Sequence, residues 1–258
     1  GKWCVSGRFA VVLQRIENVA EFNNGSGGGF GSSSGGPALS LPTGGHGARM
    51  SVLLLAEPGV AVARFPSELD IDTFIDEVDQ KIEAGSEPRQ PFSNARTAGT
   101  LRNLTLPLTL PERPGHTIVL LRGTANVLVA KKVEHIAVDP PAMAVTKQIN
   151  GMNIEISPLV KQGTNSYQTK VLISRGELDA DLWEKASRAL DDLHVVVEDL
   201  GGQSMQMSQR NERTADSITI SGNVFSSSNG TPGQIVLDIP TVLQEVKVPF
   251  EFKNLVLP

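Results

Sequence analysis

Carboxylates are the most concentrated reactive side chains in this sequence, and two of them stand one residue before a glycine pair. Glu198 and Asp199 precede Gly201-Gly202. With a histidine from a neighbouring loop, these acids could supply the general acid and base of a hydrolase that acts on glycans or peptides. Acidic residues also form turns without any catalytic role. We therefore keep the hydrolase as an alternative to a non-catalytic protein and assign no residue as catalytic.

A second group of acids surrounds a segment with helical spacing. Within it, Asp181 precedes Lys185 by four residues, and Glu184 precedes Arg188 by four residues. Acid–base pairs at this spacing stabilise an exposed helix by about 0.2–0.5 kcal/mol each. We interpret the group as a solvated helix surface rather than as a paired-carboxylate site. Its members are Glu177, Asp179, Asp181, Glu184, Asp191 and Asp192.

A third group of acids resembles the start of a calcium-binding loop. Asp70-Ile71-Asp72 begins as an EF-hand loop does, and calcium needs several converging oxygens. The pattern then fails, because Phe74 stands where the loop needs Asp or Asn and Ile75 where it needs glycine. A calcium-stabilised binding module is a further alternative, while the favoured interpretation is the polar side of a helix. The acids are Asp70, Asp72, Asp76, Glu77, Asp79 and Glu83.

The remaining reactive residues match no known site pattern. Cys4 is the single cysteine, which excludes an intrachain disulfide and a cysteine-built zinc site. The glycine run at 27–31 has no following lysine of a phosphate-binding loop. The histidines, which are His46, His116, His135 and His194, show no metal-ligand spacing. We expect no catalytic residue, no cofactor and no metal site.

Two segments that carry these acids have the periodicity of amphipathic helices. The first runs from Ser67, a potential N-cap, to Ala84, and Gly85 follows as a terminator. The second runs from Glu177 to Leu190. The apolar stripe of the first is Ile71, Phe74, Ile75, Val78 and Ile82, and that of the second is Leu178, Leu182, Ala186 and Leu190.

Strand-like segments make up most of the remaining chain. The Asn150-Gly151 pair between two such segments is typical of a two-residue β-hairpin. Strands in runs, without alternating helices, favour antiparallel sandwiches. We predict a mainly β fold of two antiparallel β-sandwich-like (immunoglobulin-like) domains, each with one short inserted helix.

Two prolines after Asp139 mark the predicted domain boundary, because proline interrupts a strand ladder. The N-terminal β-sandwich-like domain would span 1–139, with a helix near 67–84. The C-terminal β-sandwich-like domain would span 142–258, with a helix near 177–190. A Gly/Ser-rich loop at 23–36 belongs to the first domain, since eleven of its fourteen residues are glycine or serine.

Composition and charge exclude several classes of protein. The net charge of −5 provides no basic field for nucleic acid. Uninterrupted apolar runs reach five residues, against about 20 for a transmembrane helix. The chain begins at Gly1 without methionine, as it would after removal of a signal peptide or after trimming for expression.

Aromatic residues are scarce, which weakens a sugar-binding or base-stacking reading. The chain has 9 phenylalanines, 2 tryptophans and 1 tyrosine, whereas such surfaces usually display several Trp or Tyr faces. We expect Trp3, Trp183 and Tyr167 to fill core or edge positions.

The closing residues resemble the tail of a bacterial protein group. The segment Val248-Pro249-Phe250-Glu251-Phe252-Lys253-Asn254-Leu255-Val256-Leu257-Pro258 follows Ile235-Val236-Leu237-Asp238-Ile239-Pro240-Thr241. Together they resemble uncharacterised exported proteins of planctomycete-type bacteria, as does Leu120-Leu121-Arg122-Gly123-Thr124. The resemblance covers about a tenth of the chain. It implies export and a sandwich-like fold, and it carries over no functional residue.

The sequence therefore predicts a non-catalytic, exported structural or adhesion-type module, located in the periplasm or at the cell surface. Its partner would be an unknown protein or a cell-surface component, with no nucleic acid and no transmembrane segment. The strand from Glu245 to Phe252, which ends in Leu255-Val256-Leu257, is the expected exposed edge for such a partner.

Overall fold

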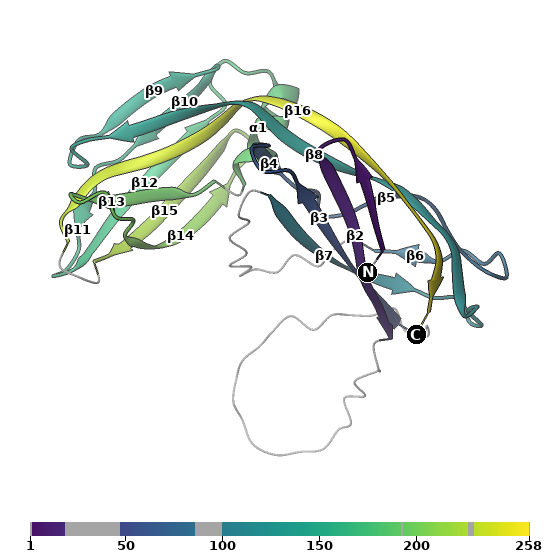
Figure 1. Ribbon diagram of the computed structural model, residues 1–258. Coiled ribbons are helices and arrows are strands. Elements are labelled where there is room, and N and C mark those ends of the chain that lie inside the picture. Colours follow the sequence, from purple (N-terminus) through teal and green to yellow (C-terminus); the bar gives the residue numbers. More distant parts are fainter. Residues whose placement is uncertain (1, 19–46, 86–99, 192, 227–229, 258) are drawn as a thin grey trace. The chain divides into compact units, whose positions relative to one another are not determined.

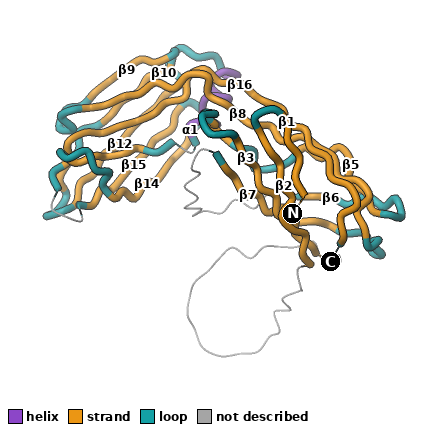
Figure 2. Tube along the Cα trace, viewed as in Figure 1, coloured by secondary structure: helices purple, strands orange, loops and turns teal. Residues whose placement is uncertain are grey.

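The protein is mainly β, as its strand-rich sequence predicts. A computed structural model describes residues 2–18, 47–85, 100–191, 193–226 and 230–257, and in these ranges it contains sixteen strands and one helix. Figure 2 shows that strand makes up most of this described chain. The strands form three sheets, and each strand pairing whose register lies in the described residues is antiparallel.

The first sheet has the strand order β1-β2-β3-β7-β6. Apolar and less buried residues alternate along β2, because successive side chains of a strand point to opposite faces. Phe9, Val11 and Leu13 are buried, whereas Ala10 and Val12 are half-buried. The strands are β1 (Lys2–Ser6), β2 (Phe9–Asn18), β3 (Gly47–Ala56), β7 (Leu101–Thr109) and β6 (Glu83–Ala84).

The second sheet has the order β14-β15-β12-β10-β9, with β11 beside β12. Asn150 and Gly151 join β9 to β10 with φ angles of 47° and 83°, which confirms the predicted two-residue hairpin. The strands are β9 (Val145–Ile149), β10 (Met152–Ile156), β11 (Val160–Lys161), β12 (Ser166–Ser174), β14 (Gln206–Arg213) and β15 (Ser217–Phe225).

Two long strands form the centre of the third sheet, which has the order β13-β16-β8-β4, with β5 also paired to β8. They are β8 (Thr117–Val138) and β16 (Pro232–Val256), and Figure 1 shows them side by side. The shorter members are β4 (Val62–Arg64), β5 (Asp70–Asp76) and β13 (Val195–Asp199).

The chain forms two compact units that are not consecutive in sequence. Unit 1 comprises residues 1–60, 65–127 and 246–258, and unit 2 comprises residues 61–64 and 128–245. Both long strands contribute to both units, so β8 passes from unit 1 into unit 2 and β16 passes back. Asp139-Pro140-Pro141, the predicted boundary between 1–139 and 142–258, lies within unit 2, just after β8 ends.

The core of unit 2 lies between the second and third sheets and includes the helix. One apolar cluster contains Ile154 and Ile173 of the second sheet, Val197 and Leu237 of the third, and Trp183 of the helix. The indole Nε1 of Trp183 donates to the carbonyl oxygen of Ala215 at 2.7 Å. The tryptophan therefore fills the core, as predicted, with its one polar atom satisfied.

The predicted helix near 177–190 is confirmed as α1 (Ala180–Leu190). The side chain of Asp179 accepts a hydrogen bond from the backbone N–H of Leu182 at 2.7 Å and so caps its first turn. The pair of Glu184 and Arg188 forms the expected i, i+4 contact.

The predicted helix near 67–84 is wrong, because this segment forms β5, a tight turn and β6. β5 pairs with β8, and the backbone N–H of Ile82 donates to the carbonyl oxygen of Phe74 at 2.8 Å. Phe74 and Ile82 are buried, but Val78 of the same predicted stripe is exposed. β-branched side chains favour strands, and pairing with β8 stabilises the strand here. The spacing that predicted a helix also fits a strand, a turn and a second strand, because this arrangement buries Phe74 and Ile82 as well.

The strand from Glu245 to Phe252 does not present the expected apolar edge. It belongs to β16, and its apolar residues Val248, Phe250 and Phe252 are buried. Nearby, the side chain of Lys2 donates to the carbonyl oxygen of Asn254 at 2.7 Å. These apolar side chains are therefore part of the core of unit 1. In the ending Leu255-Val256-Leu257 the two leucines are buried as well, whereas Val256 is 78% exposed.

Candidate functional site

An apolar depression of about 390 Å³ lies in unit 2. Its volume falls in the range of about 300–1,000 Å³ that is typical of ligand-binding sites. Five elements, β4, β8, α1, β13 and β16, and the connections before β4 and after α1 line it. The lining residues are Ala61, Val62, Ala63, Ala130, Val133, Ala189, Leu193, His194, Val196, Val236, Asp238 and Pro240, and we call this set the apolar depression.

The floor of the apolar depression is the outer side of the third sheet. In β13 and β16 the residues on either side of Val196 and Val236 are fully or almost fully buried. Side chains alternate between the faces of a strand, so Val196, Val236 and Asp238 point away from the core. A sheet face that is exposed to water usually carries polar residues. Here two valines remain half-buried on that face.

One wall of the apolar depression is formed by β4 and the end of α1. β4 and its neighbours supply Ala61, Val62 and Ala63, whereas Ala189 and Leu193 come from the last turn of α1 and the residues after it. Small alanine side chains leave the space that a larger residue would fill. The wall therefore depends on what holds β4 against α1.

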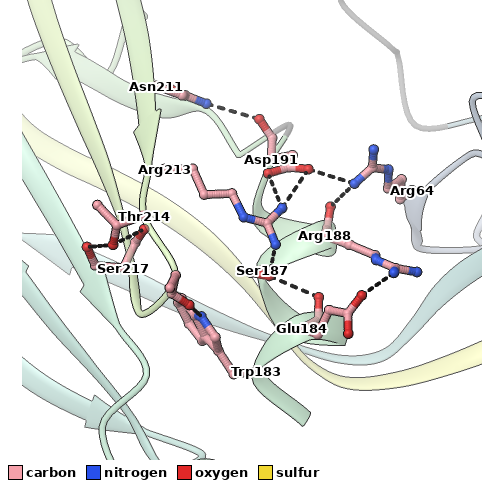
Figure 3. A network of polar contacts seen from close by, with 11 residues as sticks. Arg64, Trp183, Glu184, Ser187, Arg188, Asp191, Asn211, Arg213, Thr214 and Ser217 are labelled. Carbon is pink, nitrogen blue, oxygen red and sulfur yellow. Dashed lines mark hydrogen bonds and ion pairs between the residues drawn. The ribbon is translucent and has the colours of Figure 1, made fainter. Parts of the chain in front are cut away.

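An arginine from β4 fastens these two elements together (Figure 3). The guanidinium of Arg64 donates to the carboxylate of Asp191 at 2.7 Å and to the carbonyl oxygen of Arg188 at 3.1 Å. The latter carbonyl lies in the last turn of α1, where the negative end of the helix dipole favours a cation. Both side chains of the ion pair are about one-third exposed, so the contact is only partly screened by water.

A second arginine holds the same aspartate from the other side. Arg213 of β14 contacts both carboxylate oxygens of Asp191, at 3.2 and 3.3 Å, and donates to the hydroxyl of Ser187 at 2.6 Å. Ser187 is fully buried and itself donates to the carbonyl oxygen of Glu184 at 2.9 Å. Asp191 thus joins α1, β4 and β14, and its acid group is structural.

Polar groups at the apolar depression come from two residues. His194 and Asp238 line it, and both are exposed. Asp238 is 2.8 Å from the Nδ1 atom of His135 on the neighbouring strand. The depression therefore offers mainly apolar contact, with one imidazole and one carboxylate to orient a bound group.

The two acids of the hydrolase interpretation hold their own backbone in place. A side-chain oxygen of Asp199 accepts from the N–H groups of Gly201 and Gln203, both at 2.9 Å. Glu198 accepts from the side chain of Gln234 at 2.6 Å. Neither acid has a hydrogen bond to a histidine among the contacts of the described residues. The structure does not bring them together as an acid–base pair.

The acids between residues 70 and 83 form no cation site in the part of the chain that the structure describes. No group of three or more His, Cys, Asp or Glu side chains there could hold a metal ion. The carboxylate of Asp76 instead accepts backbone N–H groups from Val78 at 3.0 Å, Gln80 at 2.8 Å and Gly115 at 2.8 Å. Burial raises the pKa of Asp76, but these hydrogen bonds outweigh it and lower the pKa below its usual value.

Other residues considered in the sequence are dispersed. Cys4 is half-buried in β1, and Trp3 beside it is 70% exposed on the edge strand of its sheet. His116 lies just before β8, whereas His46 and the Gly/Ser-rich loop at 23–36 lie outside the described residues. Sequence reasoning missed the apolar depression, since its lining comes from short, separated segments with no shared motif.

Comparison with known proteins identifies no family. No family model matches the chain, and no curated protein matches it either. One solved structure, described as the conserved domain protein from Bacillus anthracis, aligns with 98% of this chain and 89% of its own at 9% identity and a TM-score of 0.28. A similarity at that level supports no conclusion about fold or function. No helix in the described ranges has the length and hydropathy needed to cross a membrane.

Proposed function

We propose that this protein is a non-catalytic interaction module whose apolar depression receives an apolar side chain of a partner protein or cell-surface component. The observation that carries the proposal is the pair of valines, Val196 and Val236, on the outer face of a sheet, where polar residues are the norm, beside a wall of small alanines. A concave, mainly apolar surface with a few polar side chains at its border is the usual form of a binding site. Asp191, Glu198 and Asp199, which could have served catalysis, are engaged in structural contacts.

We also propose a finer fold class and a location for the protein. Each unit would be a β-sandwich-like, immunoglobulin-like body, and the shared core of unit 2 supports sandwich packing there. The protein would be exported to the periplasm or the cell surface. The C-terminal resemblance to exported proteins supports this location.

The experiment measures binding of N-acetyl-leucinamide to the full chain by NMR shifts of methyl groups. We expect shifts at Val196, Val236 and Ala63. The variant Val133→Asp places a charge at the rim of the apolar depression and should weaken binding by about tenfold or more, equivalent to about 1.4 kcal/mol. Val242→Asp is the matched control, because Val133 and Val242 are 44% and 46% exposed and only Val133 lines the depression.

Two outcomes would reject the proposal. Shifts that spread over the surface, or equal binding by both variants, would show that the apolar depression is not the site. Turnover of a glycan or peptide that disappears in Glu198→Gln, with the fold intact, would support the alternative hydrolase instead.

A further inference from the structure

The first and second sheets have the same topology. The order β1-β2-β3-β7-β6 matches β9-β10-β12-β15-β14 strand by strand, and the matched strands follow one another in the same sequence along the chain. In both halves strands of the third sheet, β4 and β5 in the first and β13 in the second, lie between the third and fourth matched members, and a long strand comes last. We propose that the chain is an internal duplication: repeat 1 runs from β1 to β8, and repeat 2 runs from β9 to β16.

The hairpins at the start of each repeat fix the residue-by-residue correspondence. Two-residue turns separate β1 from β2 and β9 from β10, so that Val11 corresponds to Ile154. Following the pairings across each sheet then gives matching rows. One row is Lys2, Leu13, Val52 and Leu104 in repeat 1, and Val145, Ile156, Val171 and Ile220 in repeat 2. Apart from the edge residues, every member of both rows is buried.

A tight turn after β5 and after β13 is the most specific shared feature. Residues 76–80 read Asp-Glu-Val-Asp-Gln, and residues 199–203 read Asp-Leu-Gly-Gly-Gln. The fourth residue has positive φ in both turns, 60° at Asp79 and 77° at Gly202. In each turn the aspartate side chain accepts from the N–H groups two and four residues later, at 3.0 and 2.8 Å in repeat 1 and at 2.9 and 2.9 Å in repeat 2.

The backbone around these turns repeats the same contacts. In each case the aspartate N–H donates to the glutamine carbonyl oxygen, and the next residue donates to a threonine carbonyl oxygen before or at the start of the long strand. Both aspartates also lie at an irregularity that skips one residue of the long strand. The pairings are Ile75 with Leu120 and Asp76 with Ile118 in repeat 1, and Glu198 with Gln234 and Asp199 with Pro232 in repeat 2.

Each repeat ends inside the unit that the other repeat begins. β8, the last strand of repeat 1, enters unit 2 at Leu128, and β16, the last strand of repeat 2, enters unit 1 at Val246. The repeats have therefore exchanged the ends of their final strands. Their connections differ, because β4 links the third strand to β5 in repeat 1, whereas α1 links the third matched strand to β13 in repeat 2. Both of these connections border the apolar depression.

The experiment transplants the turn of repeat 2 into repeat 1 within the full chain. The substitutions Val78→Gly and Asp79→Gly place the glycine pair of residues 201–202 at the equivalent positions, and Glu77 is kept because its carboxylate accepts the backbone N–H of His116 at 3.0 Å. Glycine at position 79 adopts the positive φ without strain, which stabilises the fold, whereas glycine at position 78 raises the conformational entropy of the unfolded chain, which destabilises the fold. Because the two effects oppose each other, the Tm should change by less than about 3 °C. Asp76→Ala removes the shared acceptor and should lower the Tm by about 5 °C or more.

A second measurement tests the equivalence without any substitution. Amide hydrogen exchange of the unmodified protein should show protection factors at Gln80 and Gln203 that agree within about tenfold, since both N–H groups bond to a carboxylate. The duplication would be overturned if the transplanted turn destabilised the protein as much as Asp76→Ala. It would also be overturned if one of the two amides exchanged freely while the other was protected. Neither outcome depends on whether the apolar depression binds a partner.

Discussion

Replacing Asp76 by asparagine should strongly destabilise unit 1. The carboxylate is fully buried and accepts three backbone N–H groups. In Asp76→Asn the amide oxygen can keep two of them, but its NH₂ group would face the N–H of Gly115. One hydrogen bond to a charged group is then lost and buried donors remain unsatisfied, which costs about 2–4 kcal/mol.

The assay is thermal and urea unfolding at neutral pH, compared with Asp79→Asn. A chain of this size loses about 2–4 °C of Tm per kcal/mol, so Asp76→Asn should lower the Tm by about 4–16 °C. Asp79 is exposed and has a φ of 60°, a conformation that asparagine tolerates, so its variant should retain the original Tm. Equal losses in both variants would refute the role assigned to the Asp76 carboxylate.

The difference between Asp76→Asn and the original protein should depend on pH in a defined direction. The folded protein lowers the pKa of Asp76 from its ordinary value of 3.8. A group with a lowered pKa stabilises the fold fully above its unfolded pKa, and this contribution disappears as the pH falls through the folded pKa. The difference in unfolding free energy should therefore be constant from about pH 5 to 8 and should shrink below about pH 4. A difference that grows on acidification would contradict this account.

Three further outcomes follow from the described contacts. Arg64→Met removes the link between β4 and α1. It should lower the free energy of unfolding in urea by about 1 kcal/mol and weaken the binding of N-acetyl-leucinamide. Arg8→Met, which removes an exposed ion pair, should have neither effect. The double variant Trp3→Thr and Val5→Gln places the residue types of Thr146 and Gln148 at the equivalent exposed positions of repeat 1. Its Tm should stay within about 3 °C of that of the original protein. A larger drop would contradict the alignment of the repeats. Adding calcium or a chelator should leave the Tm unchanged, because backbone N–H groups occupy the Asp76 oxygens; a rise in Tm with calcium would show that a calcium site exists.

Local signals in the sequence predicted those elements whose stability is itself local. The Asn150-Gly151 turn and α1 are specified by residues within a few positions of each other, namely positive-φ residues in the turn and a capping aspartate at 179. The helix predicted for 67–84 was wrong because the strand in this segment forms only by pairing with β8, which lies far along the chain. Period alone cannot distinguish a helix from a strand, a turn and a second strand that bury the same residues.

The candidate site was harder to predict than the fold. Acidic residues near glycines were correctly linked to turns, but the sequence could not show that Asp199 uses its side chain to hold the turn. The apolar depression depends on which face of β16 carries the Val236 side chain and on the ion pair between Arg64 and Asp191. Such contacts between distant segments leave no motif. The repeats are hidden for a similar reason, because unequal connecting segments shift the spacing between equivalent residues.

The passage of β8 and β16 through both units limits when and how the protein can fold. No single peptide-bond cleavage releases an intact unit, because unit 1 includes residues 246–258 and unit 2 includes residues 61–64. During synthesis, β8 must wait for β16 to leave the ribosome before the third sheet is complete. Thermal denaturation should accordingly be a single cooperative event, and a nicked molecule should hold together until denaturant separates its fragments.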